Sequence, residues 1–290
     1  TSATSIAENA GSSLTLTATL SGATDQNVTV VLGTSGTATE GTDYTDGSGA
    51  VDDITITAGS TTGTVSFTPT DDSIYEGNET AIISISSVTG EASESGTQAV
   101  TITITDNESA PTVTLTTSAT SIAENAGSSL TLTATLSGAT NADVTVALST
   151  SGGATEGTDY TDGSGNIDDI VISAGSTTGT VSFTPSDDSV YEDNETATIA
   201  ISSVSGGSAT ESGTQTVTIT ITDNESAGSV TLAVSATSIA ENAGSSLTLT
   251  ATLSSVSDED VTVSLSTSGT ATEGTDYTDG SGNVDDIVIS

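Results

Sequence analysis

The chain has 290 residues, with 39 Asp and Glu and no Lys, Arg, His or Cys, which gives a formal net charge of −39. This charge repels nucleic acid phosphates and anionic lipid surfaces, so we exclude both as partners of the chain. Without His, Lys, Arg and Cys there is no serine or cysteine triad, no Schiff-base lysine and no ordinary zinc site, so we do not expect an enzyme. No run of about 18 apolar residues occurs, so we expect no insertion into a membrane.

In chain order, the first repeat shows seven stretches in which apolar residues alternate with Thr or Ser. They lie at about residues 2–6, 14–20, 28–30, 54–56, 65–67, 83–85 and 100–104. A period of two in residues rich in β-branching predicts half-buried strands. Seven short antiparallel strands in a unit of this size predict an immunoglobulin-like β-sandwich, so the expected fold class is all-β. The Cys and Trp of antibody domains are absent, so the similarity to them is one of architecture only.

The same pattern then returns along the chain. The string that begins at Thr4 recurs at Thr120 and Thr237. A spacing of domain length is too long for a solenoid coil and predicts a tandem array of separate domains. We place the first repeat, without its first few residues, at 1–110, the second at 111–227 and the first half of a third at 228–290.

Acidic residues are distributed unevenly over the predicted loops. If the chain reverses at every loop, then the first, third and fifth loops and the end of the last strand share one pole of the sandwich. In the first repeat this pole receives twelve acids: Glu8, Glu40, Asp43, Asp46, Asp52, Asp53, Asp71, Asp72, Glu76, Glu79, Asp106 and Glu108. The opposite pole receives only Asp25, Glu91 and Glu94, which we interpret as solubilising charge. A halophilic surface would explain the charge but not its concentration at one pole.

Carboxylates crowded in this way require a cation. Two like charges about 4 Å apart repel by roughly 1 kcal/mol in water and by about 4 kcal/mol at an effective dielectric constant of about 20. The chain supplies no cationic side chain. Hard oxygen ligands in loops, without nitrogen or sulfur, select Ca²⁺ over transition metals. We therefore predict Ca²⁺ as the cofactor.

Four segments, taken in order, resemble the Calx-β domain: Glu8–Gly11, Gly41–Tyr44, Asp71–Glu79 and Val100–Glu108. The resemblance covers two complete repeats and the first half of the third. It implies a sandwich that gathers several Ca²⁺ ions at the pole facing the next domain. The ligand roles it implies fall on Glu8, Asp43, Asp71, Asp72, Glu76, Glu79 and Asp106. The matching positions are Glu124, Asp159, Asp187, Asp188, Glu192, Glu195 and Asp223 in the second repeat, and only Glu241 and Asp276 in the third.

The sequence departs from the family pattern at two places. Asn107 and Asn224 interrupt the acids that follow the last strand, which leaves the number of ions open and adds Glu108 and Glu225 as candidate ligands. The third loop also carries further acids, which are Asp46, Asp52 and Asp53 in the first repeat and Asp162, Asp168 and Asp169 in the second. They form either an extra Ca²⁺ loop or an ordinary Asp-Gly-Ser-Gly turn.

Together these features predict a Ca²⁺-rigidified spacer of a giant repetitive adhesin or surface filament. Near-identical copies favour a role in length, and the short linkers Asn107–Pro111 and Asn224–Gly228 favour stiff joints between neighbouring repeats. Cysteine-free acidic repeats look like bacterial surface proteins, so we expect an extracellular location on the cell surface or in secreted form, with like chains as further partners in a filament.

Three other functions are alternatives. The first alternative is a Ca²⁺-sensing pair of domains in a transporter or signalling protein, which the resemblance also implies. Direct binding of glycans or surfaces is a second, although the strands expose Thr and Ser without aromatic clusters. Paired carboxylates could also serve a glycosidase, but five Tyr and two Phe in the whole chain do not provide aromatic sugar platforms.

Overall fold

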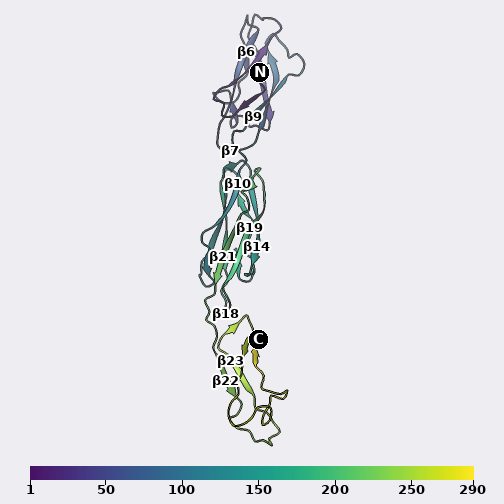
Figure 1. The fold of residues 1–290 in the computed structure, drawn as a ribbon. Helices are drawn as coiled ribbons and strands as arrows, with labels where there is room; N and C mark the ends of the chain where they lie inside the picture. Colours follow the sequence, from purple (N-terminus) through teal and green to yellow (C-terminus); the bar gives the residue numbers. More distant parts are fainter.

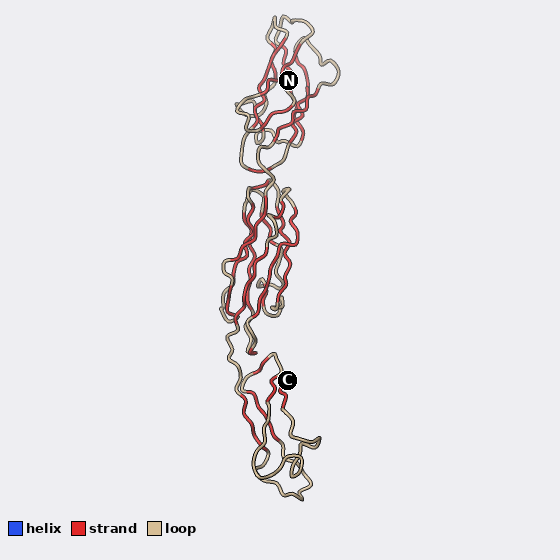
Figure 2. Tube along the Cα trace, in the orientation of Figure 1, coloured by secondary structure: helices blue, strands red, loops and turns tan.

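A computed structural model describes residues 1–290 as β-sandwich units arranged end to end along one axis (Figure 1). The chain consists of strands and loops and contains no helix (Figure 2). No segment therefore forms the long apolar helix that crosses a membrane.

The first repeat forms two facing sheets. One has the order β1-β9-β8-β3-β5 and the other the order β2-β6-β4. The strand bounds are β1 (Ser5–Ala7), β2 (Leu14–Thr19), β3 (Val28–Gly36), β4 (Tyr44–Thr45), β5 (Ile54–Ile56), β6 (Thr62–Pro69), β7 (Ile74–Tyr75), β8 (Glu79–Thr89) and β9 (Ala99–Thr105). The alternating residues predicted these strands because their apolar members point between the sheets, as in β2, where Leu14 and Leu16 are buried and Thr15 is exposed.

The second repeat has the same arrangement, with the additional strands β10 and β20 at the edge of one sheet. Its sheets have the orders β11-β21-β19-β14-β16 and β15-β17-β12-β10-β20. The bounds are β10 (Thr112–Thr117), β11 (Ser121–Ala123), β12 (Leu130–Leu136), β13 (Ala139–Thr140), β14 (Val144–Gly152), β15 (Tyr160–Thr161), β16 (Ile170–Ile172), β17 (Thr178–Pro185), β18 (Val190–Tyr191), β19 (Glu195–Ser205), β20 (Thr210–Glu211) and β21 (Thr216–Thr222).

Residues 228–290 contain the counterparts of the first strands only. They form β22 (Val230–Val234), β23 (Leu249–Leu253), β24 (Val256–Ser257), β25 (Val261–Val263) and β26 (Ile287–Ile289). Leu232 is 54% exposed, whereas its counterpart Leu115 is 5% exposed. This region has no counterpart of β19 or β21, which belong to the facing sheet in the second repeat, nor of β17, which pairs with β12.

The first strand corrects the expectation of a fully antiparallel sandwich. β1 runs parallel to β9, and β11 runs parallel to β21. The second repeat shows why: β10 pairs antiparallel with β12 in one sheet, and the chain then crosses to the other sheet, where β11 pairs with the last strand. In the second sheet β11 therefore has a neighbour, β21, that runs in its own direction.

Each complete repeat has its own hydrophobic core. Fifteen buried residues form the core of the first repeat and twenty form that of the second, with no member in common. The largest buried side chains are the stacked pairs Tyr44 and Phe67, and Tyr160 and Phe183, each with ring centroids 4.6 Å apart. Stacking with this offset suits aromatic rings and anchors the third loop, which carries Asp43, to the core.

Neighbouring repeats are joined by strand pairs as well as by the linkers. β7 of the first repeat pairs in parallel with β13 of the second, and β18 pairs in the same way with β24 (Figure 1). The linker is also held, because the Thr210 N–H donates to Pro111 O at 3.1 Å and the Ser137 N–H donates to Thr112 O at 2.9 Å. These bonds fix the end of the linker to the second repeat, while the pairing of β7 with β13 crosses the joint.

Candidate metal centre

The strand register brings distant acids to one end of each repeat. Ala7 lies opposite Thr105 and Glu79 lies opposite Ile104. The residues that follow these positions, Glu8 and Asp106, therefore meet at the same edge as the first residue of β8. At this end β3 passes so close to β8 that only a glycine fits at position 36, because a Cβ there would lie 2.0 Å from the Thr80 carbonyl oxygen. At φ +126° the backbone there also favours glycine.

A first cluster consists of Glu8, Asp106 and Glu108, each of which offers a carboxylate oxygen within 4.8 Å of the others. Glu8 is only 7% exposed, and its Oε1 has no hydrogen-bond partner; Oε2 of Glu108 is also buried without one. The second repeat reproduces the cluster with Glu124, Asp223 and Glu225, and again Oε1 of Glu124 and Oε2 of Glu225 are buried without partners. Buried polar atoms without partners are rare because each costs about 1 to 3 kcal/mol.

A second cluster lies beside the first. It consists of Asp43, Glu76 and Glu79, with Asp159, Glu192 and Glu195 as its equivalents. The two clusters are linked through Asp106, whose Oδ2 accepts hydrogen bonds from the Glu76 N–H at 2.9 Å and the Gly77 N–H at 2.6 Å. The loop before β8 is therefore folded against the residue that ends β9.

In the second repeat one small cavity joins both clusters. It has a volume of about 120 Å³, and Ile221 is its only hydrophobic lining residue. All seven positions for which the family resemblance implies ligand roles line it: Glu124, Asp159, Asp187, Asp188, Glu192, Glu195 and Asp223. Asp193, which the sequence analysis passed over, lines it as well.

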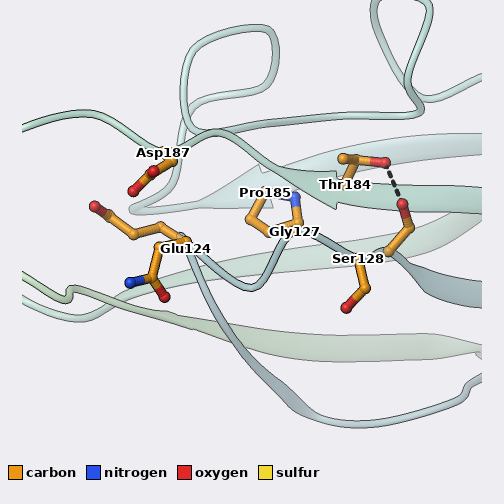
Figure 3. Close-up of a pocket in the computed structure, with 8 residues that line it drawn as sticks. Glu124, Gly127, Ser128, Thr184, Pro185 and Asp187 are labelled. Carbon is orange, nitrogen blue, oxygen red and sulfur yellow. Dashed lines mark hydrogen bonds between the residues drawn. The ribbon is translucent and has the colours of Figure 1, made fainter.

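An adjoining pocket shows how the first loop approaches this cavity (Figure 3). Glu124 and Asp187 line both spaces, and in the close-up their carboxylates lie at the same end of the pocket. The hydroxyls of Ser129 and Thr184 share a hydrogen bond of 2.7 Å, which ties the start of β12 to the end of β17. Asp187 lies two residues after the end of that strand, so this contact helps to set its position.

The pKa values of the clustered carboxylates reflect their burial and their proximity to one another. Burial, a hydrogen bond with Glu108 and the charges of Glu108 and Asp106 raise the pKa of Glu8 to about 8. Burial and the neighbouring Asp43 raise the pKa of Glu79 to about 7. Asp106 behaves in the opposite way: burial alone would raise its pKa, but backbone N–H groups of Glu108, Gly77 and Glu76 lower it.

The same asymmetry occurs in the second repeat. Burial, Glu225 and Asp223 raise the pKa of Glu124 to about 7, and burial with Asp159 raises that of Glu195 to about 7. Each centre thus holds an ionised aspartate fixed by backbone donors, together with glutamates whose ionisation is unfavourable without a compensating positive charge.

This donor set fits Ca²⁺. All the side chains are carboxylates, and several of their buried oxygens accept no hydrogen bond, which is the state in which an oxygen can bind a cation. Nitrogen and sulfur ligands, which zinc or copper would prefer, are absent from the chain. The residues that would hold the ion in the first repeat are Glu8, Asp43, Glu76, Glu79, Asp106 and Glu108.

Several acids expected at this end are engaged elsewhere. Oδ1 of Asp46 accepts hydrogen bonds from the Ser48 N–H, the Ser48 hydroxyl and the Gly49 N–H at 2.7, 2.8 and 3.1 Å, and these bonds lower the pKa of Asp46. Asp162 repeats this turn. The clusters contain none of the third-loop acids Asp46, Asp52, Asp53, Asp162, Asp168 and Asp169. The geometry is that of an ordinary turn.

The expectation that the whole third loop lies at the acidic pole was wrong for Asp53. Its Oδ1 accepts a hydrogen bond of 3.0 Å from the Leu32 N–H, in the middle of β3. The pairing of β3 with β8 shifts register between Val31 and Leu32, which disrupts the ladder at that point. The later repeats have equivalent bonds: Asp169 accepts one from the Leu148 N–H, and Asp286 accepts one from the Leu265 N–H.

The remaining candidates occupy intermediate positions. Asp71 and Asp72 are outside the tight clusters of the first repeat, but the charge of Asp72 contributes to raising the pKa of Glu76. In the third repeat Asp276 accepts a hydrogen bond from the Thr272 N–H, as Asp43 does from Thr39, while Glu241 is exposed and belongs to no cluster.

The fold and the site define the class of protein: an immunoglobulin-like β-sandwich array with clustered carboxylates at one end of each complete repeat. The chain belongs to the Calx-beta domain family, whose model matches residues 1–108, 106–225 and 223–285. Calx-beta domains bind Ca²⁺.

Comparison with solved structures finds matches of low identity and low TM-score. The calcium binding domain CBD12 of CALX1.1 is 15% identical, with a TM-score of 0.32 over 75% of this chain and 96% of that one. Invasin, a bacterial integrin-binding protein, is 17% identical, with a TM-score of 0.34 over 87% of this chain and 50% of that one. Domains 4–9 of the surface layer protein SbsC are 16% identical, with a TM-score of 0.22 over 87% and 35%. A search of curated proteins finds no match.

Proposed function

We propose that the chain is a Ca²⁺-stiffened extender segment of a large, repetitive cell-surface protein. The observation that carries the proposal is the position of β7. This strand lies between Asp72 and Glu76, and it is also the strand that pairs with the next repeat. The proposed ligands and the mechanical joint are therefore adjacent in the chain.

Ion binding would act on the joint through these neighbours. The Ile74 N–H donates to Asp72 Oδ1 at 2.7 Å, and the Glu76 N–H donates to Asp106 Oδ2. A cation held by Glu76 and Asp106 would fix the loop on both sides of β7. Fixing β7 would in turn order its pairing with β13, so a flexible connection would become a stiff one.

Length is the property that repetition provides. Nearly identical repeats, each with its own core, add reach without adding a distinct binding surface. The chain lacks Lys and Arg, so it offers no trypsin-type cleavage site, which suits an exposed location. Extracellular Ca²⁺ modules bind with dissociation constants of about 10⁻⁴ to 10⁻³ M, and we expect this range here. On this proposal the role is mechanical and not catalytic.

Small-angle scattering of the 290-residue chain tests the proposal. Protein stripped of metal is compared with protein in millimolar Ca²⁺, with Mg²⁺ as the matched cation. We expect Ca²⁺ to increase the maximum dimension and narrow the distribution of conformations, and Mg²⁺ to do much less. The double variant Asp43→Asn with Glu79→Gln should lose the response at the first joint.

The alternative role as a sensor gives a different outcome. A sensing pair would shorten or bend on binding Ca²⁺, because its signal is a change in the angle between domains. Ca²⁺ binding detected by calorimetry with no change in scattering would rule out both the extender and the sensor.

A further inference from the structure

The loop between the second and third strands carries a residue that varies among otherwise similar repeats. After the aligned segments that begin at Leu20, Leu136 and Leu253, this position holds Asp25, Asn141 and Asp258. In a single sandwich the loop lies at the pole away from the cation centre. In the array, however, that pole faces the centre of the preceding repeat (Figure 1).

Strand pairing places Asn141 beside the first centre. Ala139 lies opposite Ile74 and Thr140 opposite Tyr75, and the Asn141 N–H donates to Tyr75 O at 3.3 Å. The next residue after Tyr75 is the cluster member Glu76. The loop is firmly seated, because Thr140 is only 1% exposed and its hydroxyl donates to Ala142 O at 2.6 Å.

The second joint repeats this geometry with a carboxylate. Val256 lies opposite Val190 and Ser257 opposite Tyr191, and the Asp258 N–H donates to Tyr191 O at 3.4 Å. Here the adjoining cluster member is Glu192, which lines the cavity already described.

Side-chain interactions reach across both joints. Burial and the charges of Asp43, Asp72 and Asp106 raise the pKa of Glu76, and a hydrogen-bonding interaction with the side chain of Asn141 opposes this rise. At the second joint the charge of Asp258 adds to burial and to closer acids in raising the pKa of Glu192 and of Glu195.

The centre also carries a buried carboxylate oxygen that is free to bind a cation. Oε1 of Glu124 is buried, belongs to a side chain that is 7% exposed and has no partner, and Glu124 lines the same cavity as Glu192 and Glu195. Ca²⁺ takes about six to eight oxygen ligands, and both carboxylate and amide oxygens serve.

We propose that each succeeding repeat supplies one oxygen ligand, from Asn141 at the first joint and from Asp258 at the second, to Ca²⁺ held by the preceding repeat. The inference rests on the proposed function, since it names the residue through which the ion bridges two repeats. The choice between Asn and Asp at this position sets the Ca²⁺ affinity of the joint. The second joint has Asp258 and therefore one more carboxylate, so it binds Ca²⁺ more tightly than the first.

Titration calorimetry of metal-stripped 290-residue protein with CaCl₂ tests the assignment. Asp258→Asn should weaken binding at the second joint by about 3- to 10-fold, since ligand charge sets the affinity of such sites. Asp25→Asn is the matched control: it makes the same chemical change at the same loop position, where no preceding repeat is present in the protein under test. It should leave every Ca²⁺ affinity unchanged.

Asn141→Asp provides an independent variant, because both repeats at the first joint have complete cores. It should tighten one class of sites by about 3- to 10-fold. It should also lower the thermal midpoint of the metal-free protein, because it adds repulsion beside Glu76. The two opposite effects separate a ligand from a residue that only stabilises the joint.

The outcomes distinguish the two levels of the proposal. If the unaltered chain binds no Ca²⁺, the proposed function fails and this inference fails with it. If the chain binds Ca²⁺ but Asp258→Asn and Asn141→Asp match the Asp25→Asn control, only the bridging ligand is overturned. An affinity change that vanishes in about 0.5 M KCl reflects a screened long-range field and also overturns it, because a direct ligand retains its effect.

Discussion

At the scale of single residues, the carboxylates Glu8 and Glu124 are the least usual feature of the molecule. Each is 7% exposed and has a buried oxygen without a partner. Raised pKa values of about 8 for Glu8 and about 7 for Glu124 mean that the folded protein holds protons that the unfolded chain has already released. The charged form of the centre is therefore unfavourable until a cation offsets it.

This predicts an unusual pH dependence for the metal-free protein. Because the folded pKa of Glu8 lies above its unfolded value of 4.5, the associated stability is complete below about pH 4.5 and is lost as the pH rises towards 8. The free energy of unfolding should therefore fall between pH 5 and pH 8. Thermal melts of metal-stripped protein across this range would measure it. Stability that rose with pH in the absence of Ca²⁺ would contradict the burial of these carboxylates.

Asp53 shows an acid whose role is structural. Its side chain accepts the Leu32 N–H at the register shift between β3 and β8, so it replaces a hydrogen bond that the disrupted ladder cannot make. Neither its position nor its partner involves the cation clusters.

We predict that Asp53→Ala destabilises the protein by about 1 kcal/mol, the usual contribution of such a hydrogen bond. The loss should be the same with and without Ca²⁺. Denaturant unfolding in the two conditions would test this, with Glu91→Ala at the opposite end as the control for lost charge. A loss seen only in Ca²⁺ would instead identify Asp53 as a ligand.

At the scale of strands, the alternation of apolar residues with Thr and Ser predicted where the main strands lie. It succeeded because a half-buried strand must alternate, and β5 coincides with its predicted range of Ile54–Ile56. The parallel pairing of β1 was not predictable in the same way, since alternation reports which face is buried and not which neighbour a strand meets.

The short strands at the joints could not be read from the pattern. β7 and β13 have two residues each, too few for any periodicity, and each is defined by its partner in another repeat. The same limit applies to the site. Spacing indicated the acids that share one end of a repeat, but Asn141 and Asp258 come close to the centre only through stacking of repeats. A head-to-tail arrangement of the predicted poles was the signal that could have found them.

At the scale of the whole molecule, the chain has 39 acids and no basic side chain, so on the proposed function we expect its stability to depend on bound Ca²⁺. Each Ca²⁺ site that exists only in the folded state adds about 1.4 kcal/mol to the free energy of unfolding for every tenfold rise in free Ca²⁺ above its dissociation constant. The slope of the unfolding free energy against the logarithm of Ca²⁺ concentration therefore counts the ions released on unfolding. We expect more than one per complete repeat. A slope equivalent to a single ion for the whole chain would show that the clusters do not fill independently.

The joints described above connect unlike surfaces: the acidic end of one repeat meets the loop end of the next. A contact between two different surfaces gives the array a direction and leaves one unpaired surface at each end. Pairing of identical surfaces would instead give a closed dimer. The number of repeats in such an array can change without any change in the interfaces, because each added repeat presents the same acidic end to the repeat that follows it.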